Sequence, residues 1–179
     1  LRWVIRKTFK IKKIKVGHAG TLDPLATGLL IICVGKKTKE IDNYQGKEKE
    51  YTGTITVGGT TASFDLEEEI DQTFPTEHIT EKELQAAALK LTGEIEQYPP
   101  IFSAVKIDGK RAYESARKGE DVKVKPRQVS ISKFDIDTSE FPKVHFTIVC
   151  SKGTYIRSMA SDFGKLLGNG AHLSALRRE

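Results

Sequence analysis

The residues best suited to chemistry lie in one glycine-rich stretch, Gly17–Gly28, which reads Gly-His-Ala-Gly-Thr-Leu-Asp-Pro-Leu-Ala-Thr-Gly. Its three glycines permit a ligand to approach the backbone closely, and Pro24 biases Asp23 toward an extended conformation outside a helix. A carboxylate held in this way can project from a loop. Asp23 has no companion acid, metal-ligand spacing or cofactor fingerprint around it, which favours nucleophilic chemistry that needs little else.

Two catalytic classes that use glycine-rich loops or carboxylates do not fit this sequence. A phosphate-binding loop needs Ser or Thr after its Gly-Lys pair, whereas Gly35-Lys36 is followed by Lys37. The first glycine of that motif would fall at position 30, which is leucine. A glycosidase needs a second acid at paired spacing, and none is evident. An Asp-Pro pair between apolar runs is most often a turn, so Asp23 needs support from elsewhere in the sequence.

The elements around this loop follow from apolar periodicity. A helical pattern covers Arg2–Phe9, with Trp3 and Val4 facing inward, and the apolar run Leu29–Val34 indicates a buried strand. Tyr51–Val57 is rich in β-branched residues and alternates with period two, which predicts another strand. The glycine-rich loop is therefore expected between a helix and a buried strand.

The second half of the chain mixes strands and helices. Thr80–Glu83 has the pattern of a capping box that opens a helix, and Asp108-Gly109 suits the tight turn of a hairpin. Two long alternating runs, Gln128–Asp137 and Lys143–Ser151, predict antiparallel neighbours, and a helical pattern follows over Thr154–Leu167. This order predicts an α+β fold with a mixed, mostly antiparallel sheet flanked by helices and loops.

Charge is distributed unevenly along the chain. The formal net charge is +5, and residues 1–16 hold seven basic side chains and no acidic one. Between Asp65 and Glu83, eight acidic residues stand against one lysine. We expect the acidic stretch Asp65–Asp71 to lie away from the backbone of a bound nucleic acid. The sequence therefore predicts a basic side and an acidic side, and it permits a polyanionic partner.

The cysteines and the apolar runs indicate the compartment. Cys33 and Cys150 lie in apolar stretches without metal-ligand spacing, so we expect buried, reduced thiols in a cytoplasmic protein. No apolar run approaches the roughly 20 residues needed to cross a membrane. We expect no membrane association and no metal site.

Several ordered stretches resemble one enzyme family. Gly17–Leu30 is similar to the signature of the TruB family of pseudouridine synthases, which modify the T-arm uridine at tRNA position 55. Lys49–Tyr51, Pro99–Lys106 and Cys150–Ser158 resemble later motifs of the family, and Ala171–Arg178 resembles its closing strand. Ordered matches over most of the chain are far harder to obtain by accident than one motif.

The resemblance implies a pseudouridine synthase fold and a mechanism without a cofactor. In this family an aspartate, here Asp23, attacks the target uridine, the glycosidic bond breaks, and the base rotates and rejoins the ribose through carbon. An unperturbed aspartate has a pKa of about 3.9, so it needs no activating base at neutral pH. The same residues would otherwise fit a non-catalytic module that binds or folds tRNA, which remains the alternative.

The resemblance also assigns the residues around the nucleophile. Arg157 matches the arginine that pairs with the catalytic carboxylate, and a cation near a helix N-terminus indeed calls for a compensating anion. Tyr51 matches the tyrosine that stacks on the target base and serves in proton transfer. His18 matches the histidine that fills the space of the extruded base. Tyr155 and Leu176 match pocket-lining positions, although such residues are usually just core.

An RNA-contacting insertion is expected at about residues 97–127. Lys106 and Arg111 lie there in a basic group around the Asp-Gly hairpin and the helical pattern Ala112–Lys118, suited to contacts with phosphates of the tRNA T-arm. The basic group consists of Lys106, Lys110, Arg111, Arg117, Lys118, Lys123, Lys125 and Arg127. The insertion resembles the stand-alone bacterial type, so we expect a monomer that needs no guide RNA.

The chain is expected to be one catalytic domain, residues 1–179, truncated at both ends. The family carries a Lys-Pro-x-Gly-x-Thr-Ser-like segment ahead of the basic helix, and this sequence lacks it. It also lacks a C-terminal RNA-binding appendage.

Overall fold

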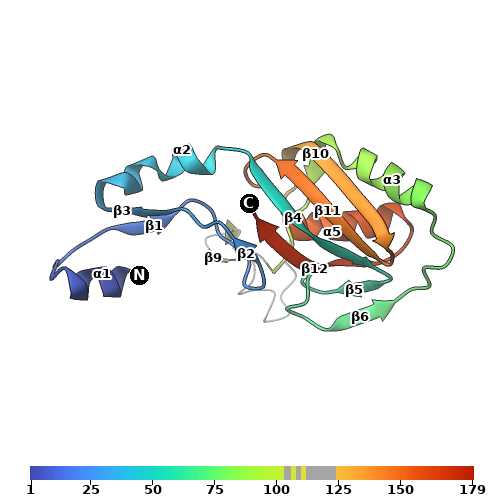
Figure 1. The fold of residues 1–179 in the computed structure, drawn as a ribbon, viewed down its shortest axis with the longest axis horizontal. Helices are drawn as coiled ribbons and strands as arrows, with labels where there is room; N and C mark the ends of the chain where they lie inside the picture. Colours follow the sequence, from blue (N-terminus) through green and yellow to red (C-terminus); the bar gives the residue numbers. More distant parts are fainter. Residues whose placement is uncertain (103–105, 108–109, 112–123) are drawn as a thin grey trace.

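A six-stranded sheet forms the body of the protein in the computed structural model, which describes residues 1–102, 106–107, 110–111 and 124–179 and only the backbone of Lys106–Ile107 and Lys110–Arg111 (Figure 1). The strand order is β2-β12-β4-β11-β10-β7, and every pairing is antiparallel except the parallel pair β2–β12. The strands are β2 (Thr27–Gly28), β4 (Lys49–Val57), β7 (Gly93–Gln97), β10 (Arg127–Glu140), β11 (Lys143–Cys150) and β12 (Ala171–Arg178). The predicted α+β class with a mostly antiparallel sheet is confirmed.

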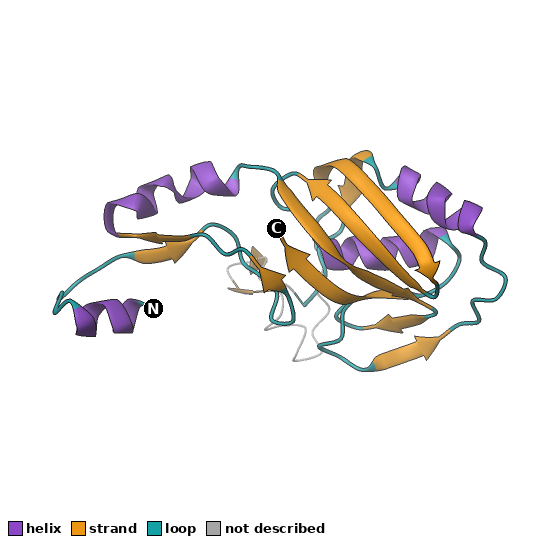
Figure 2. Cartoon of the chain, in the orientation of Figure 1, coloured by secondary structure: helices purple, strands orange, loops and turns teal. Residues whose placement is uncertain are grey.

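Two helices complete the hydrophobic core. Helix α5 (Ile156–Leu166) packs against β12, and α3 (Glu81–Lys90) packs against β10 (Figure 2). Alternation along β4 and β11 turns every second side chain inward, and the amphipathic pattern of α5 supplies the other side of the core. The side chains with no exposed surface include Ile55, Val144, Ile148, Met159 and Phe163. The predicted capping box is present, because Thr80 and Glu83 satisfy each other's backbone N–H groups.

Residues 1–18 and 32–45 form an arm that extends away from this sheet, and the loop between them reaches the sheet edge through β2 (Figure 1). It consists of α1 (Arg2–Thr8), the antiparallel pair β1 (Val16–His18) and β3 (Ile32–Val34), the 3-10 helix η1 (Gly35–Glu40) and α2 (Ile41–Gln45). Two smaller hairpins lie elsewhere: β5 (Gly59–Thr61) with β6 (Ile70–Thr73), and β8 (Lys106–Ile107) with β9 (Lys110–Arg111). The second is the hairpin predicted around Asp108-Gly109.

Burial in the arm differs from the sequence prediction. The expected buried strand Leu29–Val34 is a strand only from Ile32, and Leu29 is 54% exposed. Helix α1 forms as predicted, but Trp3 and Val4 are 69% and 51% exposed. Helix α1 buries none of its residues, because it lies on the arm away from the core. Leu29 follows the edge strand β2 and is held to Arg178 by its backbone, which leaves its side chain outside the core. The helix predicted over residues 112–118 lies outside the described residues.

The Cys150 thiol is buried at the end of β11, and burial raises its pKa to about 11. At pH 8 only about one thiol in a thousand is then ionised, against roughly a quarter for an ordinary cysteine of pKa about 8.5. We expect alkylation of Cys150 by iodoacetamide at pH 8 to be at least about 100-fold slower in the folded protein than in urea. Mass spectrometry of the peptide that contains Cys150 measures both rates, and equal rates would contradict the burial.

Candidate active site

Asp23 lies in the loop between β1 and β2, at the wall of a cavity of about 140 Å³. A turn closes behind it, because the Ala26 backbone N–H donates to the Asp23 carbonyl at 3.0 Å. The side chain is 30% exposed, so its carboxylate remains accessible. The cavity is lined by Thr21, Leu22, Asp23, Tyr51, Thr154, Tyr155, Ile156, Arg157 and Leu176. Five residues singled out in the sequence therefore meet at one cavity, from a loop, β4, α5 and β12.

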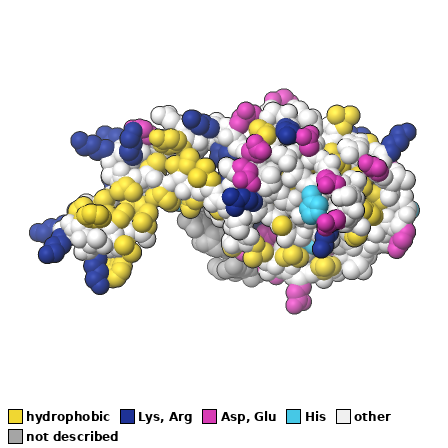
Figure 3. Space-filling view, viewed as in Figure 1, with side chains coloured by type: hydrophobic (Ala, Val, Ile, Leu, Met, Phe, Trp, Pro, Cys, Tyr) yellow, Lys and Arg dark blue, Asp and Glu magenta, His cyan; other side chains and the backbone are white. Residues whose placement is uncertain are grey.

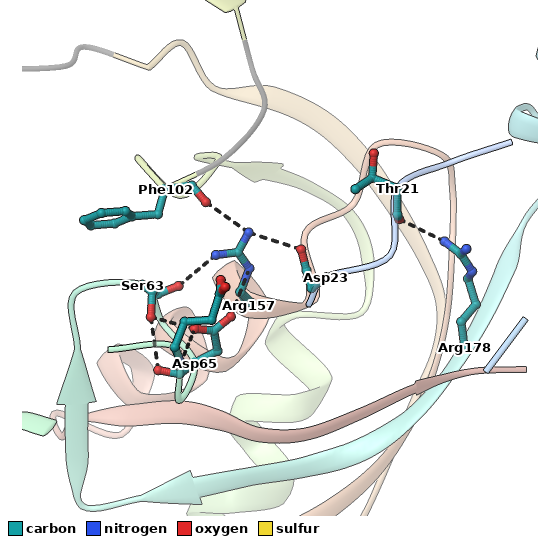
Figure 4. A network of polar contacts seen from close by, with 8 residues as sticks. Thr21, Asp23, Ser63, Asp65, Phe102, Arg157 and Arg178 are labelled. Atoms are coloured by element: carbon teal, nitrogen blue, oxygen red, sulfur yellow. Dashed lines mark hydrogen bonds and ion pairs between the residues drawn. The ribbon is translucent and has the colours of Figure 1, made fainter. Parts of the chain in front are cut away.

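Arg157 holds the Asp23 carboxylate from the first turn of α5. Its Nη2 lies 3.3 Å from Asp23 Oδ1, and its side chain is only 5% exposed (Figure 4). The same guanidinium donates to the carbonyl oxygens of Ser63 at 3.2 Å and Phe102 at 3.1 Å. A cation at a helix N-terminus opposes the helix dipole, and the carboxylate compensates for this. The guanidinium side of this ion pair is shielded from water, whereas the carboxylate stays partly exposed.

Tyr51 stands on the central strand β4 and is 9% exposed. Burial raises the pKa of its phenol above the ordinary value, and the neighbouring Arg178 guanidinium offsets only part of that rise. The phenol is therefore neutral at physiological pH. A flat neutral ring at the cavity wall can stack on a planar base and donate a hydrogen bond from its hydroxyl.

A second, larger cavity of about 720 Å³ lies along the arm. It is lined by Arg2, Arg6, Lys12, Lys13, Ile14, Lys15, Val16, Gly17, Thr38 and Ile41. Figure 3 shows Lys and Arg side chains at the outer end of the arm, while most Asp and Glu side chains of that face lie over the sheet-bearing body. The arm therefore presents positive charge next to the segment that leads to Asp23.

The sequence model described as "TruB family pseudouridylate synthase (N terminal domain)" matches residues 6–156. The chain belongs to the TruB family. Relatives named tRNA pseudouridine synthase B are 57% identical in Flavobacterium johnsoniae and 54% identical in Phocaeicola vulgatus. The alignments cover 98% and 99% of this chain and 76% of each relative. This TruB chain is thus a pseudouridine synthase, an isomerase, and the predicted family is confirmed.

Solved structures agree with the TruB assignment. A chain of a Cbf5-Nop10-Gar1 complex superposes with a TM-score of 0.69 at 28% identity, covering 98% of this chain and 42% of that one. A chain of an H/ACA RNP bound to a substrate RNA, at 24% identity and a TM-score of 0.65, shares the fold. The TruB chain therefore has the pseudouridine synthase fold.

The remaining TruB motif residues lie at different distances from the cavity. Tyr155 and Leu176 line it, and the Arg127 guanidinium lies over the Tyr155 ring, 5.3 Å from its centroid. His18 ends β1 with its side chain exposed and does not line the cavity. Lys106 and Arg111 face each other as backbone partners in the β8–β9 hairpin, and their side chains lie outside the described residues.

Sequence reasoning missed Asp65, which is part of this TruB site. Its Oδ2 lies 3.5 Å from Arg157 Nε, and its side chain is 6% exposed. Ser63 Oγ donates to the other carboxylate oxygen at 2.6 Å (Figure 4). The Glu67 backbone N–H donates to the same oxygen at 3.0 Å. Residues 64–65 pair with Leu173 of β12, and this pairing places Asp65 in the interior although it begins an acidic stretch of the sequence. No feature of the acidic sequence distinguished Asp65 from its neighbours.

Proposed function

We propose that this enzyme converts the T-arm uridine at tRNA position 55 to pseudouridine, with Asp23 as the nucleophile. The observation that carries the proposal is the accessible Asp23 carboxylate, held by buried Arg157 at a cavity that Tyr51 also lines. The family membership and the relatives named tRNA pseudouridine synthase B support tRNA as the substrate. An RNA-modifying role in tRNA maturation also fits a cytoplasmic protein.

The proposed reaction exchanges one bond at the ribose for another. A carboxylate oxygen of Asp23 bonds to ribose C1′ as the N1–C1′ bond breaks, and the electron pair leaves with N1 of the uracil. The base then rotates within the cavity, and C5 displaces the carboxylate from C1′. The C5 proton is lost to solvent and N1 gains a proton, so the product has the mass of the substrate. No cofactor or metal takes part.

The wall residues have separate tasks in this reaction. Arg157 fixes the direction of the Asp23 carboxylate before attack and compensates for its charge. Tyr51 stacks on the uracil as a neutral phenol and confines its rotation. The nucleotide must leave the helical stack to reach the cavity, and His18 on the arm fills the space that it vacates. Tyr155 and Leu176 complete the apolar wall.

RNA binding is assigned to the basic surfaces beside the cavity. The five basic side chains along the arm cavity, with Lys106 and Arg111 of the insertion at about 97–127, contact phosphates of the T-arm. Shape and stacking, more than base-edge hydrogen bonds, then select the uridine. A single copy of the chain suffices, and no guide RNA is needed.

The test uses a tRNA transcript labelled with tritium at C5 of uridine. We expect release of one tritium per tRNA, and only background release from a transcript with cytidine at position 55. Equal tritium release from the two transcripts would mean that the enzyme modifies a uridine other than the one at position 55. Tight, salt-sensitive binding of the first transcript without any release would instead favour the non-catalytic tRNA-binding module.

A further inference from the structure

Arg178, near the end of β12, holds the segment that carries Asp23. Its side chain donates to three carbonyl oxygens: Leu29 from Nε at 2.8 Å, Thr21 from Nη1 at 3.1 Å and Gly20 from Nη2 at 3.4 Å. Figure 4 shows the guanidinium directed at Thr21, two residues before Asp23. Arg178 is 5% exposed. One side chain therefore spans both ends of the segment 20–29.

The backbone of Arg178 holds the same segment. Its carbonyl accepts from the Leu29 backbone N–H at 2.8 Å, and Arg178 is the parallel strand partner of Gly28. Gly28 has φ +100°, and a Cβ there would lie 2.0 Å from the Arg178 carbonyl oxygen. Only glycine permits this approach, so the segment around the nucleophile is adapted to the backbone of β12 at position 178.

The charge of Arg178 is not neutralised by a carboxylate among the described residues. Another cation lies nearby, since Arg178 Nη1 and Lys49 Cε would both lie within 4 Å of a Cβ at Gly20. Burial, and then the charge of Arg178, lowers the pKa of Lys49. A buried guanidinium without a counter-ion is costly to a fold. Carbonyl dipoles of the nucleophile segment stabilise it here, which ties its position to theirs.

We propose that Arg178 is a positioning residue for the isomerisation, which keeps the segment 20–29 in the conformation that points Asp23 into the cavity. This proposal rests on Asp23 as the nucleophile. Arg157 restrains the carboxylate from the α5 side, and Arg178 restrains the backbone from the β12 side. Without the second restraint the loop can shift, and a shift of about 1 Å is enough to cost about 100-fold in rate.

The test compares kcat and KM for tritium release in three variants of the full chain. We expect Arg178→Met to lower kcat about 100-fold while KM for the tRNA transcript stays within about threefold. Arg178→Lys should recover only part of the loss, about tenfold, because an ammonium group cannot reproduce the planar fork of donors. Arg177→Met is the matched control. It removes the same charge from the same strand, but Arg177 is 57% exposed and pairs with Glu179, so kcat should stay within about twofold.

The outcomes separate positioning from other roles. A rise in KM at unchanged kcat would overturn the proposal, because Arg178 would then act on the RNA. The proposal would also be overturned if Arg178→Met and Arg178→Lys lost kcat equally and both had a lower melting temperature. Arg178 would then have a purely structural role. If Arg178→Met does not fold, the kcat of Arg178→Lys decides. If Asp23→Asn is inactive and Arg178→Met is fully active, the positioning role of Arg178 is contradicted and the nucleophile assignment stands. If Asp23→Asn is active, the nucleophile assignment itself is contradicted.

Discussion

Replacing Asp23 by asparagine is expected to reduce tritium release by at least about 10⁴-fold, to the background of the assay. The amide has almost the shape of the carboxylate but cannot bond to ribose C1′ as a nucleophile. Binding of the tRNA transcript should stay within about threefold, because the cationic surfaces are unchanged. Release under single-turnover conditions, measured with filter binding of the same transcript, gives both quantities.

A second substitution makes this experiment decisive. Asp23→Ala removes the oxygen altogether and cannot revert to aspartate by deamidation, so residual activity in the asparagine variant can be traced. Both variants should fold, since the side chain is 30% exposed and Arg157 keeps Asp65 as a partner. More than about a tenth of wild-type activity in Asp23→Ala would rule out Asp23 as the nucleophile.

Replacing Arg157 by methionine is expected to lower the free energy of unfolding by about 3–5 kcal/mol and to abolish activity. The loss arises because Asp65 is 6% exposed and would remain as a buried carboxylate without its cation. The Ser63 and Phe102 carbonyls would lose their donor as well. Urea denaturation followed by circular dichroism measures the change.

The double variant Arg157→Met/Asp65→Asn isolates the buried pair. Replacing the unpaired Asp65 carboxylate by an amide should restore about 2 kcal/mol of the free energy of unfolding that Arg157→Met loses. Activity should stay absent, because Asp23 still lacks its partner. The control is Lys165→Met on the same helix. Its ion pair with Asp162 is shorter, at 2.7 Å, but Lys165 is 67% exposed, so we expect a change below about 1 kcal/mol. Equal stability of the single and double variants would mean that Asp65 and Arg157 are not coupled.

Local patterns in the sequence predict the body of the fold well. Alternation marks β4, β10 and β11, and α5 has a clear apolar face, because these elements contribute every second or every third to fourth side chain to one core. The polar edge strand β7, Gly93–Gln97, was not predicted. It reads Gly-Glu-Ile-Glu-Gln and turns few apolar side chains inward, so pairing with β10 is its main support.

Long-range pairing determines what the sequence could not predict. Leu29 and Leu30 look like core residues, but they follow the two-residue edge strand β2 and are 54% and 40% exposed. Asp65 and Arg178 look like surface charges and lie in the interior, because strand pairings many residues away bury them. The motif residues Asp23 and Arg157 were recognisable only through the family resemblance, since their contact joins positions 134 apart.

The pairing of β2 with β12 also determines when the active site can form during folding and synthesis. Thr27 lies beside Arg177, so the two strands meet only after a loop of about 150 residues has closed. Contacts of such high sequence separation form late and slowly in folding. During synthesis, β12 must emerge from the ribosome before Leu176 can line the cavity and Arg178 can bind the loop that carries Asp23. A growing chain therefore completes the cavity around Asp23 only after almost all of the described fold has left the ribosome.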